Sequence, residues 1–236
     1  MTPEIIAGHG PILLICDHAS NAVPPGIDLG IAAALLDKHI AIDIGAAAVT
    51  RALAAQLGAP AILATVSRLV IDFHRPPDHA GLVPEISDGH PIPGNIGADR
   101  YARIARYHAP YHRALGEMIG SYRPRLLVSI HSFTSALESG SAPRPWEIGI
   151  LYNRDTRAAH RAIAAFQGAG VVTGDNQPYS GRDLNMTLNR HGEGNGIASF
   201  AIELRNELID HPADVDHWAG VIAPVLSGIA QAIQSA

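Results

Sequence analysis

The stretch LLVSIH, residues 126–131, is an apolar run of strand length that ends in a histidine. A run this short, bounded by turn-forming residues, is typical of a strand buried on both faces of a sheet. Further runs of this kind, where we also expect strands, are ILLIC (12–16), AILATV (61–66), IGILYN (148–153), GVVTG (170–174) and SFAIEL (199–204). Together they predict a sheet at the centre of the molecule.

Stretches with helical period separate these runs. The first is marked by apolar residues three or four positions apart, at Ile42, Ala46, Val49, Leu53 and Leu57. Gly58 is placed to end this helix in the left-handed conformation. The second passes through Ile104, Tyr111, Leu115 and Ile119, and Pro110 should start, kink or break it. With further helices expected at 158–167 and 218–234, the alternation predicts an α/β sandwich with helices on both faces of the sheet.

Composition describes one globular domain, residues 1–236, with a net charge of -5 and no run of Lys or Arg. Binding to a phosphate backbone needs a concentrated basic face, so nucleic acid is not an expected partner. The single cysteine, Cys16, excludes an internal disulfide. Acidic Glu4 and the short apolar stretch 11–16 argue against a signal peptide or a membrane anchor, and we expect a cytoplasmic protein.

Two stretches rich in Gly, Pro, Asn and Asp, residues 75–95 and 175–196, have no clear strand or helix pattern. Loops this long in a compact domain are usually lids or binding loops. We therefore expect them to border the functional site.

Polar residues follow or end three of the predicted strands. His18 comes after the first, His131 ends the central one, and Glu203 lies near the end of a late one. Ligands in open α/β sheets bind beyond the carboxyl ends of strands, so these side chains should converge if the strands are neighbours. Two imidazoles with one further carboxylate ligand form a catalytic zinc site that leaves a position for water.

The acidic zinc ligand is harder to assign than the two histidines. Asp43, expected in the first turn of the helix after the first strand, is our choice because a loop return can bring that turn beside the strand exit. Asp17 and His39 are the competitors.

Glu203 stands inside the apolar run FAIEL, where an isolated charge is costly to bury. Such a residue needs a partner or a function. One interpretation is an ion pair with Arg205 or another arginine, and the other is a general base for catalysis.

Arginines are candidates for binding an anionic substrate, because the planar guanidinium binds a carboxylate through two hydrogen bonds. Arg68, Asp72 and Arg75 place alternating charges along the strand-like run SRLVIDFHRP, although a loop-bracing salt bridge explains them equally well. Weaker candidates of the same kind are Arg144, Asn153, Asn185 and Arg205. The pair His108 and His112 has metal-binding spacing, but Pro110 between them disturbs the helix that would align them.

Several motifs together resemble the N-formylglutamate amidohydrolase family: DHASNAVP, HIAIDIGAAAVT, SRLVIDFHRP, SIHSF, RPWEIGILYN, GDNQPYSGRDLN and FAIELRNEL. The likeness covers nearly the whole chain. It implies a three-layer α/β/α sandwich with a mixed, mostly parallel central sheet, similar to zinc-dependent exopeptidases, and one zinc ion per chain. It also implies His18, Asp43 and His131 as ligands and Glu203 as the catalytic carboxylate. His74 stands where we expect asparagine in the family, which bears on substrate preference.

The resemblance implies hydrolysis of N-formyl-L-glutamate, or a related small anionic N-acyl amino acid, to the free amino acid and formate. The substrate-binding residues would be Arg68, Arg75, Arg144, Asn153 and Arg205. Two alternatives remain open at this point: a binding or regulatory protein that keeps the fold without the metal, and a carboxypeptidase-like peptidase.

Overall fold

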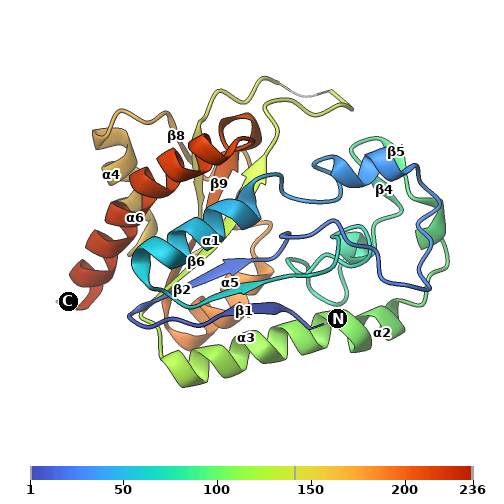
Figure 1. The fold of residues 1–236 in the computed structure, drawn as a ribbon, viewed down its shortest axis with the longest axis horizontal. Coiled ribbons are helices and arrows are strands. Elements are labelled where there is room, and N and C mark those ends of the chain that lie inside the picture. Colours follow the sequence, from blue (N-terminus) through green and yellow to red (C-terminus); the bar gives the residue numbers. More distant parts are fainter. Residues whose placement is uncertain (1, 141, 235–236) are drawn as a thin grey trace.

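The computed structural model describes residues 2–140 and 142–234, which form helices around one large sheet (Figure 1). The strands of this sheet are β1 (Glu4–Ile6), β2 (Ile12–Cys16), β3 (Ala61–Leu63), β6 (Leu126–Phe133), β7 (Ile148–Leu151), β8 (Thr173–Asp175) and β9 (Ala198–Arg205). The helices are α1 (Ala46–Leu57), α2 (Arg100–Arg103), α3 (Ala109–Tyr122), α4 (Ala159–Gly168), α5 (Met186–His191) and α6 (Pro212–Gln234).

The seven strands have the order β1-β3-β2-β6-β9-β7-β8. β3, β2, β6 and β9 run parallel to one another, as do β7 and β8, whereas β1 is antiparallel to β3 and β7 is antiparallel to β9. The predicted mixed, mostly parallel sheet is therefore confirmed. This order makes β2, β6 and β9 neighbours and brings their carboxyl ends to one edge.

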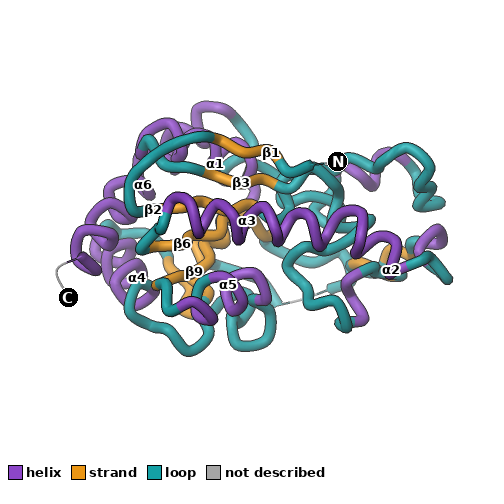
Figure 2. The backbone as a smooth tube through the Cα atoms, turned by 90° about the horizontal axis from the view of Figure 1, so that it is seen from below, coloured by secondary structure: helices purple, strands orange, loops and turns teal. Residues whose placement is uncertain are grey.

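Two hydrophobic cores lie on opposite faces of the sheet. Alternate residues of β2 divide between them: Leu14 packs in the core formed with α1, α4 and α6, and Leu13 in the core formed with α3. Figure 2 shows α3 and α5 lying across the strands on that second face. Helices on both faces confirm the three-layer arrangement.

The predicted elements match the structure where apolar periodicity was strong. β2 spans the expected residues, and α1 ends at Gly58, whose positive φ of 60° is the left-handed cap expected of it. β3 ends at Leu63, earlier than expected, and β8 begins only at Thr173. The short edge strand β1 was not predicted.

The second predicted helix changes its geometry close to Pro110. A π-helical turn (Ile104–His108) joins α2 to α3 without a break in the helical backbone, and Pro110 lies directly after it, in the first turn of α3. Pro110 thus neither starts nor breaks the helix: it lies within one helical stretch, residues 100–122, whose geometry changes to π in the turn before it.

The two long loops contain short elements that composition did not reveal. The first carries the small hairpin of β4 (Ile86–Ser87) and β5 (His90–Pro91), and the second contains α5. Residues 67–75 were expected to be strand-like, and this expectation is wrong. They form turns, in which the backbone N–H of Val70 donates to the carbonyl of Ser67. Turns in this run bring its charged side chains back towards β2.

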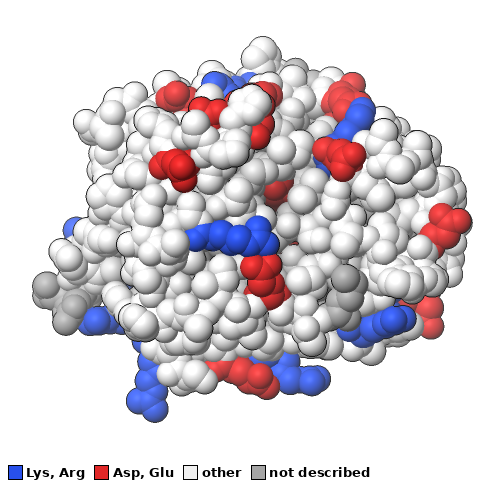
Figure 3. All heavy atoms as spheres, viewed as in Figure 1, with Lys and Arg blue, Asp and Glu red and all other residues white. Residues whose placement is uncertain are grey.

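Charged side chains are scattered over the surface. On the face shown in Figure 3, Lys and Arg alternate with Asp and Glu and form no basic patch. Among the described residues, no helix has the length and apolar character needed to cross a membrane.

Candidate metal centre and active site

The carboxyl ends of β2, β6 and β9 place His18, His131 and Glu203 around one cavity of about 420 Å³. His18 follows β2, whereas His131 and Glu203 are directly opposite each other in the register of β6 and β9. All three side chains are buried. The predicted convergence of the two imidazoles and the acid is therefore present in the structure.

Asp43 lies between the two imidazoles. Its Oδ2 is 3.2 Å from Nδ1 of His18 and 2.8 Å from Nδ1 of His131. The three residues form a buried group whose candidate ligand atoms are all within 4.8 Å of one another. Asp43 is not in the first turn of α1, as we expected, but in the turn before it, where its N–H donates to the carbonyl of His18 at 3.1 Å.

Each imidazole is fixed from behind by its other nitrogen. Nε2 of His18 is 2.7 Å from Oδ1 of Asp72, and Nε2 of His131 is 2.8 Å from Oγ of Ser129. Arg68 donates to Oδ1 of Asp43 at 2.9 Å and to Oδ2 of Asp72 at 3.0 Å. Histidine ligands of metals usually have such partners, which hold the ring in one orientation.

The donor set suits zinc. Two imidazole nitrogens and one carboxylate oxygen are ligands of a catalytic zinc site. Burial works to raise the pKa of Asp43, but the charge of His18 and the hydrogen bond from His131 hold it well below its usual range. Asp43 is therefore ionised, as a carboxylate ligand must be.

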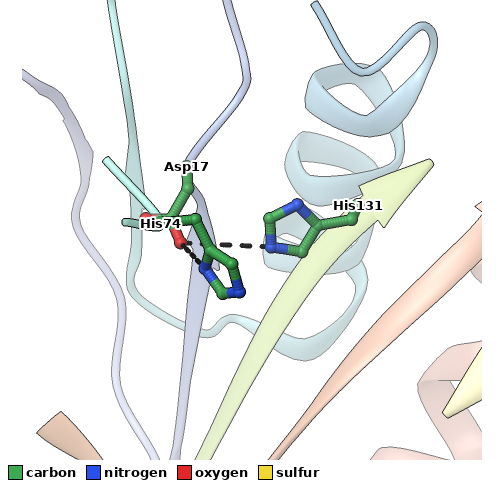
Figure 4. Close-up of side chains that lie close together, drawn as sticks. All are labelled: Asp17, His74 and His131. Carbon is green, nitrogen blue, oxygen red and sulfur yellow. Dashed lines mark hydrogen bonds and ion pairs between the residues drawn. The ribbon is translucent and has the colours of Figure 1, made fainter. Parts of the chain in front are cut away.

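The competing ligand Asp17 belongs to a second group with His74 and His131 (Figure 4). Oδ2 of Asp17 is 2.8 Å from Nδ1 of His74 and 3.9 Å from Nε2 of His131, while its Oδ1 accepts a hydrogen bond from Tyr111 at 2.7 Å. Asp17 is bound to His74 and Tyr111, and Nε2 of His131 is bound to Ser129. Asp17 therefore remains a competitor, and Asp43 stays our choice of acidic ligand in the candidate group with His18 and His131.

The other competitor, His39, lines the outer part of the cavity, and its Nε2 is 2.8 Å from Oδ2 of Asp88. Asp88 also accepts hydrogen bonds from Ser139. The hydrogen bonds between Asp88 and Ser139 join the turn of the β4–β5 hairpin to the loop after β6 at the cavity rim. Sequence patterns did not single out Asp88, because its partners are far apart along the chain.

Glu203 is the least satisfied acid of the cavity. Burial, reinforced by the charge of Asp43, raises its pKa from 4.5 to about 8. Its Oε2 is buried and has no hydrogen-bond partner among the residues that the structure describes. Among the described residues, no ion pair joins Glu203 to Arg205 or to another arginine, and Arg205 lies 3.7 Å from Glu207 instead. A buried carboxyl with a displaced pKa, facing a cavity, is the pattern of a catalytic acid or base.

The arginine candidates differ in what they already bind. Arg68 lines the cavity, but two carboxylates occupy its guanidinium. Arg75 also lines the cavity, and its ion pair with Asp72 is long, at 3.8 Å. Arg144 donates to Oη of Tyr179 at 3.0 Å and lies over its ring. Arg75 is therefore the cavity arginine with the most freedom to bind an anion.

Two weaker candidates point elsewhere. Nδ2 of Asn153 donates to Oε2 of Glu193 at 3.1 Å, and Arg205 donates to the carbonyl of Pro145 at 3.4 Å. Neither is among the residues that line the cavity. Their contacts brace loops around the site.

His108 and His112 do not form a metal pair. Nε2 of His108 donates to the carbonyl of Arg75 at 3.0 Å, and Nε2 of His112 to that of Phe73 at 3.0 Å. These two hydrogen bonds hold the backbone carbonyls of the residues on either side of His74. The pair thus supports the wall of the site from the face that carries α3.

A model of the N-formylglutamate amidohydrolase family matches residues 10–209. The chain belongs to this family. The resemblance inferred from the motifs is thereby confirmed, and amide hydrolysis is the activity that the family supports. The matched segment contains His18, Asp43, His131 and Glu203.

Solved structures share the fold of this chain. The chain is similar to the gene product Atu2144 of Agrobacterium tumefaciens, with 33% identity, a TM-score of 0.94, and coverage of 99% of this chain and 96% of that one. It is also similar in fold to an N-formylglutamate amidohydrolase of Ralstonia eutropha JMP134, with 19% identity, a TM-score of 0.75, and coverage of 99% and 98%. No curated protein matches the chain.

Proposed function

We propose that this amidohydrolase depends on one zinc ion per chain and removes the formyl group from N-formyl-L-glutamate, giving L-glutamate and formate. One observation carries the proposal: two imidazoles and an ionised carboxylate converge on a cavity that also contains the unpartnered acid Glu203. Family membership supports the amide as the bond that is cleaved.

In this proposal the imidazoles of His18 and His131 and the carboxylate of Asp43 would hold the zinc ion. Bound zinc supplies Lewis acidity and lowers the pKa of water to about 7. Asp72 and Ser129 keep both rings oriented through their Nε2 atoms.

Glu203 is the proton carrier. Its carboxylate takes a proton from water as the water oxygen bonds to the formyl carbon, and it then delivers the proton to the amide nitrogen as the C–N bond breaks. After burial, the charge of Asp43 is the next cause of the raised pKa of Glu203, so a cation bound to Asp43 would lower that pKa and favour the carboxylate form.

Arg75 is our choice for binding a substrate carboxylate. Its guanidinium faces the cavity and has one long ion pair among the described residues. Arg68 instead holds Asp43 and Asp72 in place, and Arg144 orients Tyr179 at the cavity wall.

Formate release from N-formyl-L-glutamate by the purified, zinc-loaded protein tests the proposal. N-acetyl and peptide derivatives of acidic and neutral amino acids serve as comparison substrates. If the protein hydrolyses only another N-acyl amino acid, amide hydrolysis remains the proposed reaction and N-formyl-L-glutamate is not the substrate. A protein that retains no stoichiometric zinc and hydrolyses none of them would instead be a binding or regulatory member of the family.

A further inference from the structure

His74 lies beside both histidines of the proposed metal centre. Its ring centroid is 6.1 Å from that of His18 and 4.9 Å from that of His131. The residue is 9% exposed and lines the cavity that contains Glu203. An amide bond held at this centre for hydrolysis would therefore lie close to the His74 ring.

One nitrogen of the His74 ring is held by a buried network. Nδ1 is 2.8 Å from Oδ2 of Asp17, whose other oxygen, Oδ1, accepts a hydrogen bond from Oη of Tyr111 at 2.7 Å. Both Asp17 and Tyr111 are buried. A carboxylate only accepts hydrogen bonds, so in the neutral ring the proton is on Nδ1 and Nε2 has the free lone pair.

The backbone around His74 is fixed as well. Its N–H donates to Oδ1 of Asp72 at 2.9 Å, and the carbonyls of the residues before and after it accept hydrogen bonds from His112 and His108. Turning the ring would break its hydrogen bond to Asp17, because the backbone is held in place. The direction of Nε2 is therefore set before a ligand binds, which reduces the entropy that binding costs.

Nε2 of His74 is free to bind a ligand. Figure 4 shows this nitrogen on the side of the ring that faces away from Asp17. Among the described residues it has no hydrogen-bond partner. A nitrogen lone pair in the wall of a cavity accepts a hydrogen bond from a ligand that carries an N–H or an O–H.

An amide substrate brings such a donor next to the bond that is cleaved, namely its own N–H. Inside the cavity this N–H loses its water partner, and leaving it without an acceptor costs free energy. Nε2 of His74 replaces the water. A hydrogen bond there also fixes the orientation of the amide nitrogen, so that its lone pair faces the proton that Glu203 delivers as the C–N bond breaks.

We infer that Nε2 of His74 accepts a hydrogen bond from the amide N–H of the substrate, with Asp17 and Tyr111 as positioning residues that fix the ring. The inference rests on the proposed function, which supplies the amide, and adds how the site distinguishes an amide from an ester. His74 binds the substrate nitrogen and transfers no proton.

The test compares N-formyl-L-glutamate with O-formyl-L-2-hydroxyglutarate, an ester with oxygen in place of the N–H, after correction for spontaneous hydrolysis. His74→Ala removes the acceptor, and His74→Gln replaces it with an amide oxygen. His39→Ala is the matched control. The ring of His39 is also bound to an aspartate, Asp88, and lines the same cavity, but among the described residues it makes no ring contact with His18 or His131.

We expect His74→Ala to lower kcat/KM for the amide about tenfold, as loss of one hydrogen bond does, and not to lower it for the ester. His74→Gln should recover most of the loss, and His39→Ala should change both substrates by the same factor. An equal loss for amide and ester in His74→Ala would overturn the inference, because a structural role or a proton transfer affects both. Loss of zinc from His74→Ala, measured by elemental analysis, would also overturn it.

Failure of the proposed function is distinguishable from this outcome. If neither formyl compound is hydrolysed, the proposed reaction is wrong, and calorimetric titration of the zinc-loaded proteins with the same two compounds still decides the role of His74. A lower Kd for the amide that becomes equal to that of the ester in His74→Ala supports the inference, and equal Kd values in the wild-type protein overturn it. Nitrogen NMR of the histidine rings checks the tautomer independently, since a proton on Nε2 of His74 in the zinc-loaded protein would contradict its role as an acceptor.

Discussion

Replacing Glu203 with glutamine should have opposite effects on activity and on stability. Hydrolysis should fall by about 10²- to 10⁴-fold, the usual contribution of a positioned proton carrier. The zinc-free protein should become more stable at alkaline pH, because the wild-type carboxyl is buried without a partner for Oε2.

The stability effect follows from the raised pKa of Glu203. The stability that the protonated Glu203 carboxyl contributes to the folded protein is fully present below the ordinary pKa of 4.5, and it is lost as the pH rises through about 8. One pKa unit corresponds to about 1.4 kcal/mol, so the full cost above this range is about 4 to 5 kcal/mol. An unpaired glutamine amide costs about 1 to 3 kcal/mol. The net gain for Glu203→Gln at pH 9 is therefore about 2 kcal/mol.

Urea denaturation with a chelator present, at pH 5 and pH 9, measures this difference. Glu117→Gln is the control, since Glu117 is exposed on α3 and should show no change at either pH. If the free energy of unfolding differs between Glu203→Gln and wild type by the same amount at pH 5 and at pH 9, ionisation of the buried Glu203 carboxyl is not the cause of the stability difference. Retained turnover in Glu203→Gln with zinc bound would remove this residue from catalysis.

Three further predictions concern the metal and the packing beneath it. Dialysis against a chelator should abolish formate release, and added zinc should restore it at one ion per chain by elemental analysis; an unchanged rate would exclude the metal. Asp72→Asn should weaken zinc affinity about 10- to 100-fold, measured by competition with a chelating dye, because His18 loses its carboxylate partner. Gly149→Ala should cost about 1 to 3 kcal/mol in urea denaturation, since a Cβ would clash with the carbonyl of Gln177. Gly116→Ala, with open space around it, should not destabilise the protein.

The sequence predicted the central strands and the meeting of His18, His131 and Glu203, because buried parallel strands leave continuous apolar runs. It did not predict β1, which is three partly exposed residues at a sheet edge, or α5, which lies in a loop rich in Gly and Asn. Such short elements are held by tertiary contacts and leave little periodicity.

The partners of the site residues were harder to predict than the residues themselves. From the sequence, Arg68 and Asp72 could serve either in substrate binding or in a salt bridge. In the structure Asp72 contacts His18, and Arg68 forms ion pairs with Asp43 and Asp72. Their roles depend on turns in residues 67–75, which alternating charges had suggested were a strand. Asp17 could be placed near the site, but its attachment to Tyr111 and His74 depends on side-chain directions that spacing does not specify.

The pairing of His131 with Glu203 across β6 and β9 makes the chemistry sensitive to insertions and deletions. Side chains alternate between the two faces of a strand, so shifting either strand by one residue would turn its functional group into the opposite hydrophobic core. The same slip would bring an apolar neighbour, Ile130 or Ile202, to the cavity. Changes of length should therefore be tolerated in the loops around these strands and not within them.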